Sequence, residues 1–192
     1  MSDYEEDKTW SEKMLARVVW PAIRAAYGGG NLLSVEGDHG VVTNQLDMTS
    51  GIDALIVSEK GIQSIASRVQ RSKPTAPWNT FTSRSARNTR AKTEYEKRKS
   101  AIDGNDSLYP MLTLHAYVSN RDESFVSASI IKTEHLYRFI EEEPDKVKTQ
   151  RAPNAIFKYV RWRDLAKWMI AKNIRGSMRV FKLQAEFNEL VN

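Results

Sequence analysis

The sequence predicts an α/β fold in which a mixed central sheet is flanked by helices. One observation is the order of elements that its patterns indicate: a helix, several strands, a basic insertion, two strands, then a helix, a strand and a helix. A second is the length of 192 residues with 41% apolar side chains, which suits one domain with a substantial core. A third is a pair of strands at residues 52–70 that carries acidic and basic groups near the strand ends.

The N-terminal segment, residues 9–27, has the apolar spacing of a helix. Its apolar stripe consists of Met14, Leu15, Val18, Val19, Ala22 and Ile23. Thr9 and Glu12 have the spacing of a capping box, so the helix is expected to begin near Thr9. Pro21 is expected to kink or divide this helix, and the three glycines at 28–30 are expected to end it.

Four strands are predicted after the glycines. Residues 32–36 and 41–46 alternate between apolar and polar side chains, with a turn expected at 37–40. Residues 52–57 and 62–70 form the second pair, separated by a short turn that contains a glycine. The strong apolar content of 52–57 indicates that this strand is buried.

The middle of the chain is rich in proline, serine, threonine and arginine. Residues 72–93 are predicted to be a loop or lid, with a basic helix from about Arg84 to Ala101. Arg84, Arg87 and Arg90 recur every three residues, so on a helix they would form one stripe suited to a phosphate backbone.

The C-terminal half predicts an antiparallel strand pair, a helix, a strand and a second helix. These elements fall at residues 109–118, 124–132, 134–143, 155–160 and 164–172. Residues 178–187 fit either a helix or a strand. No internal repeat or linker interrupts the pattern, so residues 1–192 are expected to form one domain with a basic insertion at about 71–101.

Charge is distributed unevenly along the chain. The net charge is +5, and the segment from Arg68 to Lys99 holds ten basic residues against two acidic ones. The remainder of the chain has 19 basic and 22 acidic residues. One basic segment on an otherwise slightly acidic chain favours a polyanionic partner, although a charge run is also typical of a solvated surface.

The composition of the chain indicates where in the cell the protein is expected. No apolar run approaches the roughly 20 residues of a membrane helix, and the acidic N-terminus lacks the features of a secretory signal. Because the chain has no cysteine, it can form neither a disulfide nor a thiolate metal site. A cytoplasmic protein without a membrane partner is therefore expected, and the oligomeric state, including a homo-oligomer, stays open.

The second strand pair, residues 52–57 and 62–70, contains or adjoins the main candidate functional residues. Asp53 enters the first strand, and Arg68 and Gln70 leave the second on alternate residues that share one face. If the hairpin places Asp53 beside Arg68, a carboxylate and a guanidinium meet at one edge of the sheet. Carboxylate oxygens suit Mg²⁺, and a fixed cation stabilises charge that develops on a phosphate.

On these residues the chain resembles the PD-(D/E)XK nuclease superfamily, which has a restriction-endonuclease-like fold. Glu12 resembles the family's helix glutamate, and Asp53 its strand aspartate. Residues 66–68 stand at the acid-x-lysine position, and Gln70 at the polar position two residues beyond it. Asp47 matches an acid that phage-type members place shortly before this aspartate.

The resemblance implies a Mg²⁺-dependent endonuclease, for which Mn²⁺ could substitute, acting on DNA in preference to RNA. Asp53 would hold the metal with Glu12 or Asp47. Arg68 would fix the phosphate, and Gln70 would orient water. The expected nucleic-acid contacts come from Arg71, Lys73, Arg84, Arg87, Arg90 and Lys92.

Two departures from the family pattern keep other functions open. Ala66 stands where the family has an acid that binds metal. Arg68 stands where the family has a lysine, and arginine can bind a phosphate but cannot act as a base. A nucleic-acid-binding protein that has lost cleavage is the alternative, and a protein that binds another protein through its aromatic C-terminal half is a third.

Structural interpretations of the same residues also stay open. Asp53 could be satisfied by the turn before its strand, Arg68 could pair with Glu59, and Glu12 could serve only as a cap. Asp47 could belong to an Asx turn. Trp78 and Phe81 could stack on bases or pack in the core, and no two of the three histidines have metal-ligand spacing.

Overall fold

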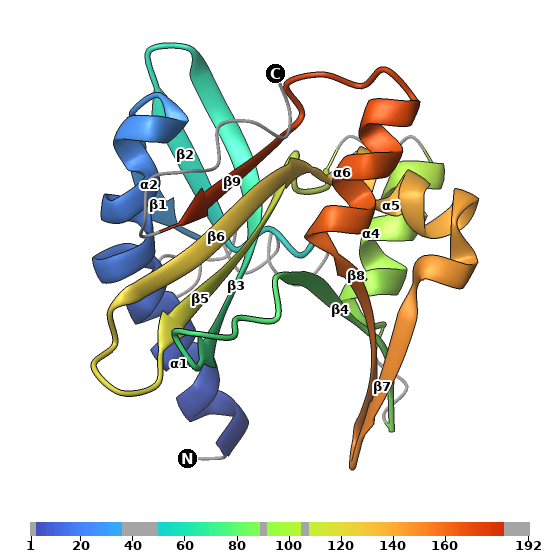
Figure 1. The fold of residues 1–192 in the computed structure, drawn as a ribbon, viewed down its shortest axis with the longest axis horizontal. Coiled ribbons are helices and arrows are strands. Elements are labelled where there is room, and N and C mark those ends of the chain that lie inside the picture. The colour runs from blue at the N-terminus through green and yellow to red at the C-terminus, as the bar shows by residue number, and fades with distance from the viewer. Residues whose placement is uncertain (1–2, 36–49, 89–91, 105–107, 183–192) are drawn as a thin grey trace.

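The computed structural model describes residues 3–35, 50–88, 92–104 and 108–182, which form a mixed α/β structure with two sheets (Figure 1). The predicted turn at 37–40, the predicted strand at 41–46, Asp47 and Arg90 therefore lie outside the described residues. Among the described residues, no helix is long and apolar enough to cross a membrane.

The larger sheet, which has six strands in the described ranges, forms the centre of the molecule. In spatial order these are β1 (Asn31–Ser34), β2 (Ala54–Ser58), β3 (Gly61–Ser72), β5 (Leu112–Ser119), β6 (Phe125–Lys132) and β9 (Met178–Lys182). Of the strand pairs in the described part of this sheet, only β3 and β5 are parallel, and the others are antiparallel. The element between β3 and β5 is therefore a crossover, which here contains β4 and α4.

One face of this sheet is covered by the N-terminal helix, which has three parts. They are α1 (Asp3–Met14), the π-helical turn η1 (Leu15–Val19) and α2 (Trp20–Tyr27). The π turn ends at Val19, two residues before Pro21, which lacks the N–H that a regular helix requires. The expected distortion at Pro21 is thus confirmed. Apolar residues of this helix pack against Ile65, Val69 and Leu114 of the sheet.

The expected start of this helix is wrong. Because α1 begins at Asp3, Thr9 and Glu12 lie inside the helix and do not form an N-terminal capping box. The structure forms that motif at Thr93 instead, where the side chains of Thr93 and Glu96 cap each other's backbone N–H groups at the start of α4 (Glu94–Asp103).

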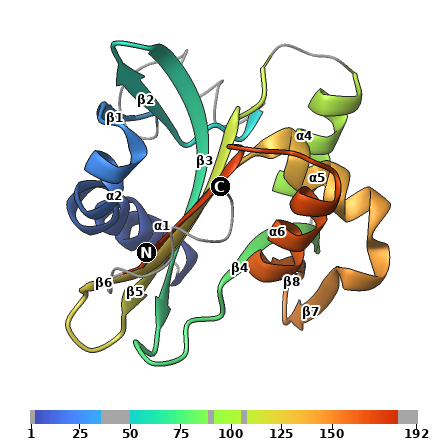
Figure 2. The ribbon, with the colours of Figure 1, turned by 45° about the horizontal axis from the view of Figure 1, so that its top comes forward.

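The smaller sheet has three strands in the order β4 (Thr80–Arg87), β8 (Ala155–Arg161) and β7 (Lys148–Ala152). It lies with α4, α5 (Thr133–Glu142) and α6 (Trp162–Ala171) on the side of the large sheet that faces away from α1 and α2 (Figure 2). A short 3₁₀ turn, η3 (Pro144–Lys146), joins α5 to β7. A second core, with Phe81, Tyr117 and Trp162, connects this layer to the large sheet.

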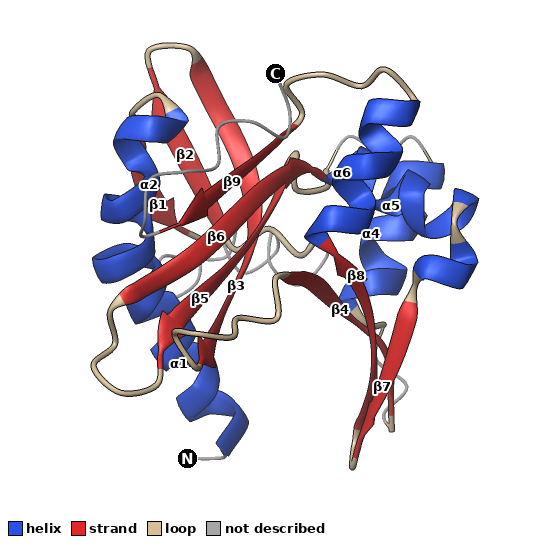
Figure 3. Ribbon diagram, in the orientation of Figure 1, coloured by secondary structure: helices blue, strands red, loops and turns tan. Residues whose placement is uncertain are grey.

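The predictions of a loop or lid over residues 72–93 and of a basic helix beginning near Arg84 are wrong, because residues 80–87 form strand β4 and the helix begins at Glu94. Strand β7 was not predicted either, since all five of its side chains are exposed and no apolar pattern marks it. Figure 3 shows both strands in the small sheet. The predicted antiparallel pair, the two C-terminal helices and the strand between them are confirmed, and residues 178–182 are a strand.

Two buried polar side chains of β5 join the sheets. The Tyr117 hydroxyl lies 3.1 Å from both the amide nitrogen and the carbonyl oxygen of Thr80. The His115 Nδ1 lies 3.1 Å from the Thr82 amide nitrogen, which donates to it. These contacts hold β4 against the large sheet at one end, so the space beyond them is bounded by both sheets.

Candidate functional site

A cleft of about 1040 Å³ lies between the two sheets. It opens where β3 continues beyond the pairing of Ala54 with Ile65, so that, among the described residues, no strand of the large sheet pairs with this edge of β3 from Ala66 onward. Residues from α1, β3, β5, α4 and the small sheet line it. The cleft therefore has one wall from each half of the fold.

Asp53 lies at the inner end of this cleft, directly before β2. Its backbone N–H donates to the Ile65 carbonyl at 2.9 Å, and its Oδ2 accepts the Ser67 N–H at 2.5 Å. Two residues further along the same edge of β3, the Val69 N–H donates to Ser11 Oγ at 3.1 Å. The open edge of β3 is thus satisfied by side chains, and Asp53 has a fixed orientation and a structural role in addition to its charge.

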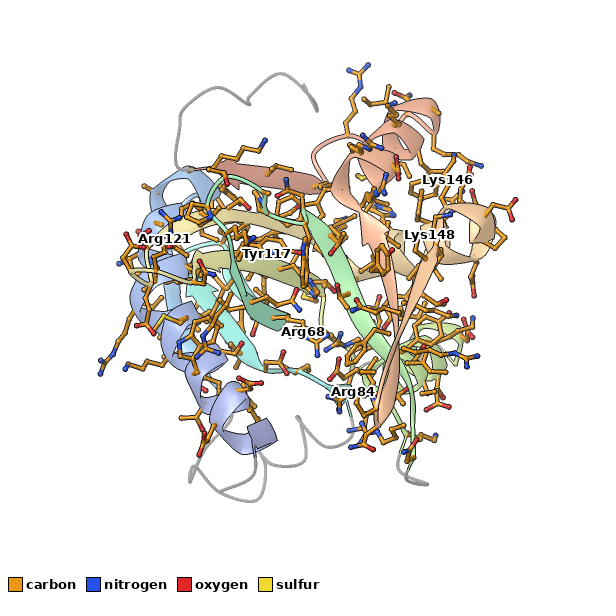
Figure 4. The ribbon with its side chains drawn as sticks, turned by 60° about the horizontal axis from the view of Figure 1, so that its bottom comes forward. Arg68, Arg84, Tyr117, Arg121, Lys146 and Lys148 are labelled. Atoms are coloured by element: carbon orange, nitrogen blue, oxygen red, sulfur yellow. The ribbon has the colours of Figure 1, made fainter. Side chains whose placement is uncertain are left out.

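Arg68 lies on β3, two residues beyond Ala66, and faces the small sheet. It is in register with His115 of β5. Its guanidinium carbon is 5.2 Å from the centre of the Phe157 ring, and that of Arg84 is 5.6 Å from the same ring. Figure 4 shows Arg68 and Arg84 approaching each other from the two walls. Arg68 thus lines the same cleft as Asp53, while Glu59 is exposed in the turn before β3.

Glu94, in the first turn of α4, was not singled out from the sequence. Burial would raise the pKa of its carboxyl, but the guanidinium groups of Arg68, Arg98 and Arg84 lower it below its ordinary value. Glu94 is therefore a carboxylate at neutral pH. One feature of the sequence could have drawn attention to Glu94. Thr93 and Glu96 complete the capping box by themselves, so capping does not account for Glu94.

Arg98, one turn along α4, is a second cation that sequence reasoning missed. Its side chain is buried, and its Nη2 donates to the Gly51 carbonyl at 3.2 Å, two residues before Asp53. Burial alone would lower its pKa, but Tyr137, Asp53 and Glu94 together raise it above the ordinary value. Its Nε is buried without a hydrogen-bond partner in the described structure. Arg98 thus connects α4 to the segment that positions Asp53.

His115 also lines the cleft. Burial lowers its pKa well below the ordinary value, and the nearby charges of Arg68 and Arg98 lower it further. The imidazole is therefore neutral at pH 7, and it does not add to the positive charge of the cleft.

Most of the predicted site residues come together here. The cleft is lined by Glu12, Asp53, Arg68, Gln70, Arg71, Arg84 and Arg87. Lys73 and Lys92 are exposed and do not line it, and Asp47 and Arg90 lie outside the described residues. Arg71 at the rim pairs with Asp7 at 3.3 Å and lies over the Trp10 ring at 3.9 Å.

A β-bulge explains why Arg84 and Arg87 both reach the cleft from a strand. Residues three apart on a regular strand point to opposite faces. In β4, Arg84 pairs with Phe157 and Ala86 with Ile156, so Ser85 is an extra residue. The insertion restores Arg87 to the face of Arg84. Both arginines therefore face the cleft without the helical stripe that the sequence predicted.

The cleft is positive overall. Eight of its lining residues are lysine or arginine, against the four acidic residues Asp7, Glu12, Asp53 and Glu94. Because the space is bounded on two sides, the fields of these cations add within it. This arrangement favours a polyanion in the cleft.

The donor set of the cleft fits Mg²⁺ with few protein ligands. Within the described part of the chain, no three histidine or acidic residues gather closely enough to hold a metal by themselves. Mg²⁺ in phosphoryl-transfer sites, however, uses one or two carboxylates together with water and substrate phosphate. Asp53, Glu12 and Glu94 line the cleft and carry carboxylate oxygens of this kind.

Comparisons with protein-family models, with curated proteins and with solved structures give no match for this chain.

Proposed function

We propose that this protein hydrolyses phosphodiester bonds of nucleic acid in a Mg²⁺-dependent reaction, as an endonuclease that prefers DNA. The observation that carries the proposal is the gathering of Asp53 and Glu94 with three guanidinium groups, those of Arg68, Arg84 and Arg98, in one positive cleft. Carboxylates that bind a divalent cation, beside guanidiniums that bind phosphate, are the groups this chemistry requires.

The topology supports a restriction-endonuclease-like fold. In the described residues a helix with Glu12 precedes three strands, β1 to β3, that pair antiparallel in this order, and Asp53 lies directly before the second. Residues 66–68 lie on the third, and after α4 the next strand of the sheet, β5, pairs in parallel with β3. This is the order of elements that the resemblance to PD-(D/E)XK nucleases implies.

Each residue has a distinct part in the proposed reaction. Asp53 would hold Mg²⁺, whose positive charge polarises the scissile phosphate and lowers the pKa of bound water. Arg68, between Asp53 and the small sheet, would bind a non-bridging phosphate oxygen and stabilise charge that develops there. Gln70, on the same face of β3, would orient water through its side-chain amide, whose Oε1 has no hydrogen-bond partner in the described structure.

Glu94 supports cleavage despite the alanine at position 66. Ala66 is buried and lines the cleft, but it offers no oxygen ligand. Glu94 enters the same cleft from α4 as a carboxylate, within the field of Arg68 and Arg98. We therefore propose that Glu94 takes the place of the acid missing at Ala66.

A nucleic-acid-binding protein without cleavage is the second candidate, and one observation favours it. In the described structure the charge of Glu94 is already balanced by arginines. If those guanidiniums keep Glu94 from a metal, the cleft would bind phosphate and leave it intact.

The test is an assay of supercoiled plasmid, single-stranded DNA and RNA with Mg²⁺ and with Mn²⁺. The wild type is compared with Asp53→Asn, which can still accept the Ser67 N–H but has lost the charge. Cleavage is expected to fall more than about 100-fold in Asp53→Asn, since even partners of metal ligands are worth about 10–100-fold.

Glu94→Gln tests whether Glu94 takes the place of the acid missing at Ala66, and cleavage by the wild type separates the two candidates. If Glu94 replaces the missing acid, this variant loses cleavage to a similar extent while it retains DNA binding. A wild type that binds DNA but cleaves no substrate with either metal would favour the second candidate. A wild type that neither binds nor cleaves nucleic acid would refute both.

A further inference from the structure

The cleft face of the small sheet carries a row of aromatic side chains. Phe157 and Tyr159 lie two residues apart on β8, the central strand, and both line the cleft. Each is flanked across the sheet by a polar neighbour on both sides. Phe157 pairs with Arg84 and Gln150, and Tyr159 pairs with Thr82 and Lys148. Aromatic rings on a central strand with basic neighbours form a surface suited to stacking bases.

Trp78 is a further aromatic side chain that lines the cleft. It lies in the connection between β3 and β4, is 63% exposed and lines the cleft. Exposure of a large indole leaves apolar surface in water, which is unfavourable unless a ligand covers it. Phe81, the other candidate for stacking, is buried against Trp162 and His115 and belongs to the core.

Positive charge surrounds the aromatic row. Arg84 and Arg161 flank it on the small sheet, and Arg68 faces it from β3. The guanidiniums of Arg68 and Arg84 lie against the Phe157 ring, and planar guanidiniums also stack on bases. The charges would bind the sugar-phosphate chain while the rings bind the bases, so one strand is contacted on both its sides.

We infer that the substrate enters the cleft as a single strand, with bases stacked on Trp78 and Tyr159. The faces of bases inside a duplex are covered by their neighbours, so a duplex can use the charges of the cleft but not its rings. An unpaired strand, whether a free single strand or an unpaired segment of a larger substrate, can use both. This inference rests on the proposed function and names the substrate class of the same site.

The inference is tested by binding, which does not depend on cleavage. Fluorescence anisotropy in EDTA compares three labelled ligands: a single-stranded DNA, the same sequence as a blunt duplex, and a strand of equal length made of abasic sites. The wild type is expected to bind the single strand more tightly than either of the others. Trp78→Ala and Tyr159→Ala are each expected to weaken single-strand binding roughly 5- to 100-fold and to leave abasic-strand binding unchanged.

Matched variants exclude a loss of folding. Trp78→Phe and Tyr159→Phe keep an aromatic ring and are expected to keep most of the affinity. Ile170→Ala removes an apolar side chain that is 58% exposed on α6, away from the cleft, and is expected to have no effect. Intrinsic tryptophan fluorescence provides a second measurement, because the single strand should quench emission of the wild type more than that of Trp78→Ala.

The outcomes separate this inference from the proposed function. Equal affinity for duplex and single strand, or an equal loss of abasic-strand binding in Trp78→Ala, would overturn the stacking inference and leave the nuclease proposal standing. Ring-dependent binding without cleavage would refute the nuclease proposal and support stacking. Binding of no nucleic acid would refute both.

Discussion

The two sheets of this protein differ in what their faces carry. The six-stranded sheet presents aliphatic side chains such as Ile65, Leu114 and Ile130 to the N-terminal helix, and all three are buried. The three-stranded sheet presents Arg84, Phe157 and other partly exposed side chains to the cleft. The first sheet is stabilised by its apolar face, whereas much of the second is left available to a ligand.

This difference supports the cleft face of the small sheet as the proposed functional surface. A sheet face that packs in a core gains stability from burial and accepts only apolar residues of suitable size. A face of arginine, glutamine and tyrosine gains little from folding, because charged and polar groups lose hydration when they are buried. The residues on the small sheet are thus explained better by a ligand than by packing. The edge of β3, with Asp53 and Arg68, faces this surface.

The largest effect expected from this comparison is on stability. Leu114→Ala on β5 removes a fully buried side chain from the core beneath the N-terminal helix. It is expected to lower the free energy of unfolding by about 3 kcal/mol, which urea denaturation would measure. Nucleic-acid affinity of the folded fraction should stay unchanged, because Leu114 lies on the face of β5 opposite His115.

A loss of affinity in Leu114→Ala that exceeds its unfolded fraction would contradict the division of roles between the two sheets. Ala171→Gly at the exposed end of α6 is a suitable control, because it also shortens a side chain but opens no cavity in the core. Its effect should be well below that of Leu114→Ala, at about 1 kcal/mol or less.

The same contrast explains which parts of the fold could be predicted from the sequence. Strands β2, β3, β5 and β6 carry buried apolar residues with strand-like patterns, and their positions were predicted to within a few residues. Strand β7 has only exposed side chains, and β4 has serine and arginine with a bulge at Ser85. Pattern reasoning depends on buried apolar residues that alternate along a strand, so it fails where exposed or polar side chains replace them.

The candidate site divides in the same way. Asp53 and Arg68 belong to one hairpin, so local register was enough to place them together. Glu94 and Arg98 reach the cleft only because α4 folds back over it, and no local spacing links them to Asp53. Such residues become visible only when tertiary contacts are known.

An intermediate effect is expected on the salt dependence of binding. The double variant Arg84→Gln with Arg87→Gln removes two charges from the cleft face of β4, and the glutamine side chains can still form hydrogen bonds. If each arginine contacts one phosphate, the slope of log affinity against log salt concentration should become shallower by about 1.4 for single-stranded DNA. Titrations at several NaCl concentrations measure this slope.

Lys73→Gln with Lys92→Gln is the matched control, because these lysines are exposed and do not line the cleft. Its slope should be close to that of the wild type. Equal changes in the two double variants would mean that binding follows total charge, and the small sheet would then have no special part in it.

The smallest effect is expected at His115, which joins the two sheets. Burial, with Arg68 and Arg98, lowers its pKa, so the folded protein keeps the imidazole neutral while the unfolded chain protonates it below about pH 6.5. The unfolded state therefore binds more protons there, and stability must fall as the pH decreases from about 6.5. His115→Gln should flatten this decline, as measured by urea midpoints at several pH values. The same measurement on His135→Gln corrects for His135, whose pKa burial also lowers. A bound phosphate would offset the charges of Arg68 and Arg98, so bound nucleic acid should reduce the loss of stability at low pH that is due to His115. If this loss is the same with and without nucleic acid, the bound strand lies away from β3.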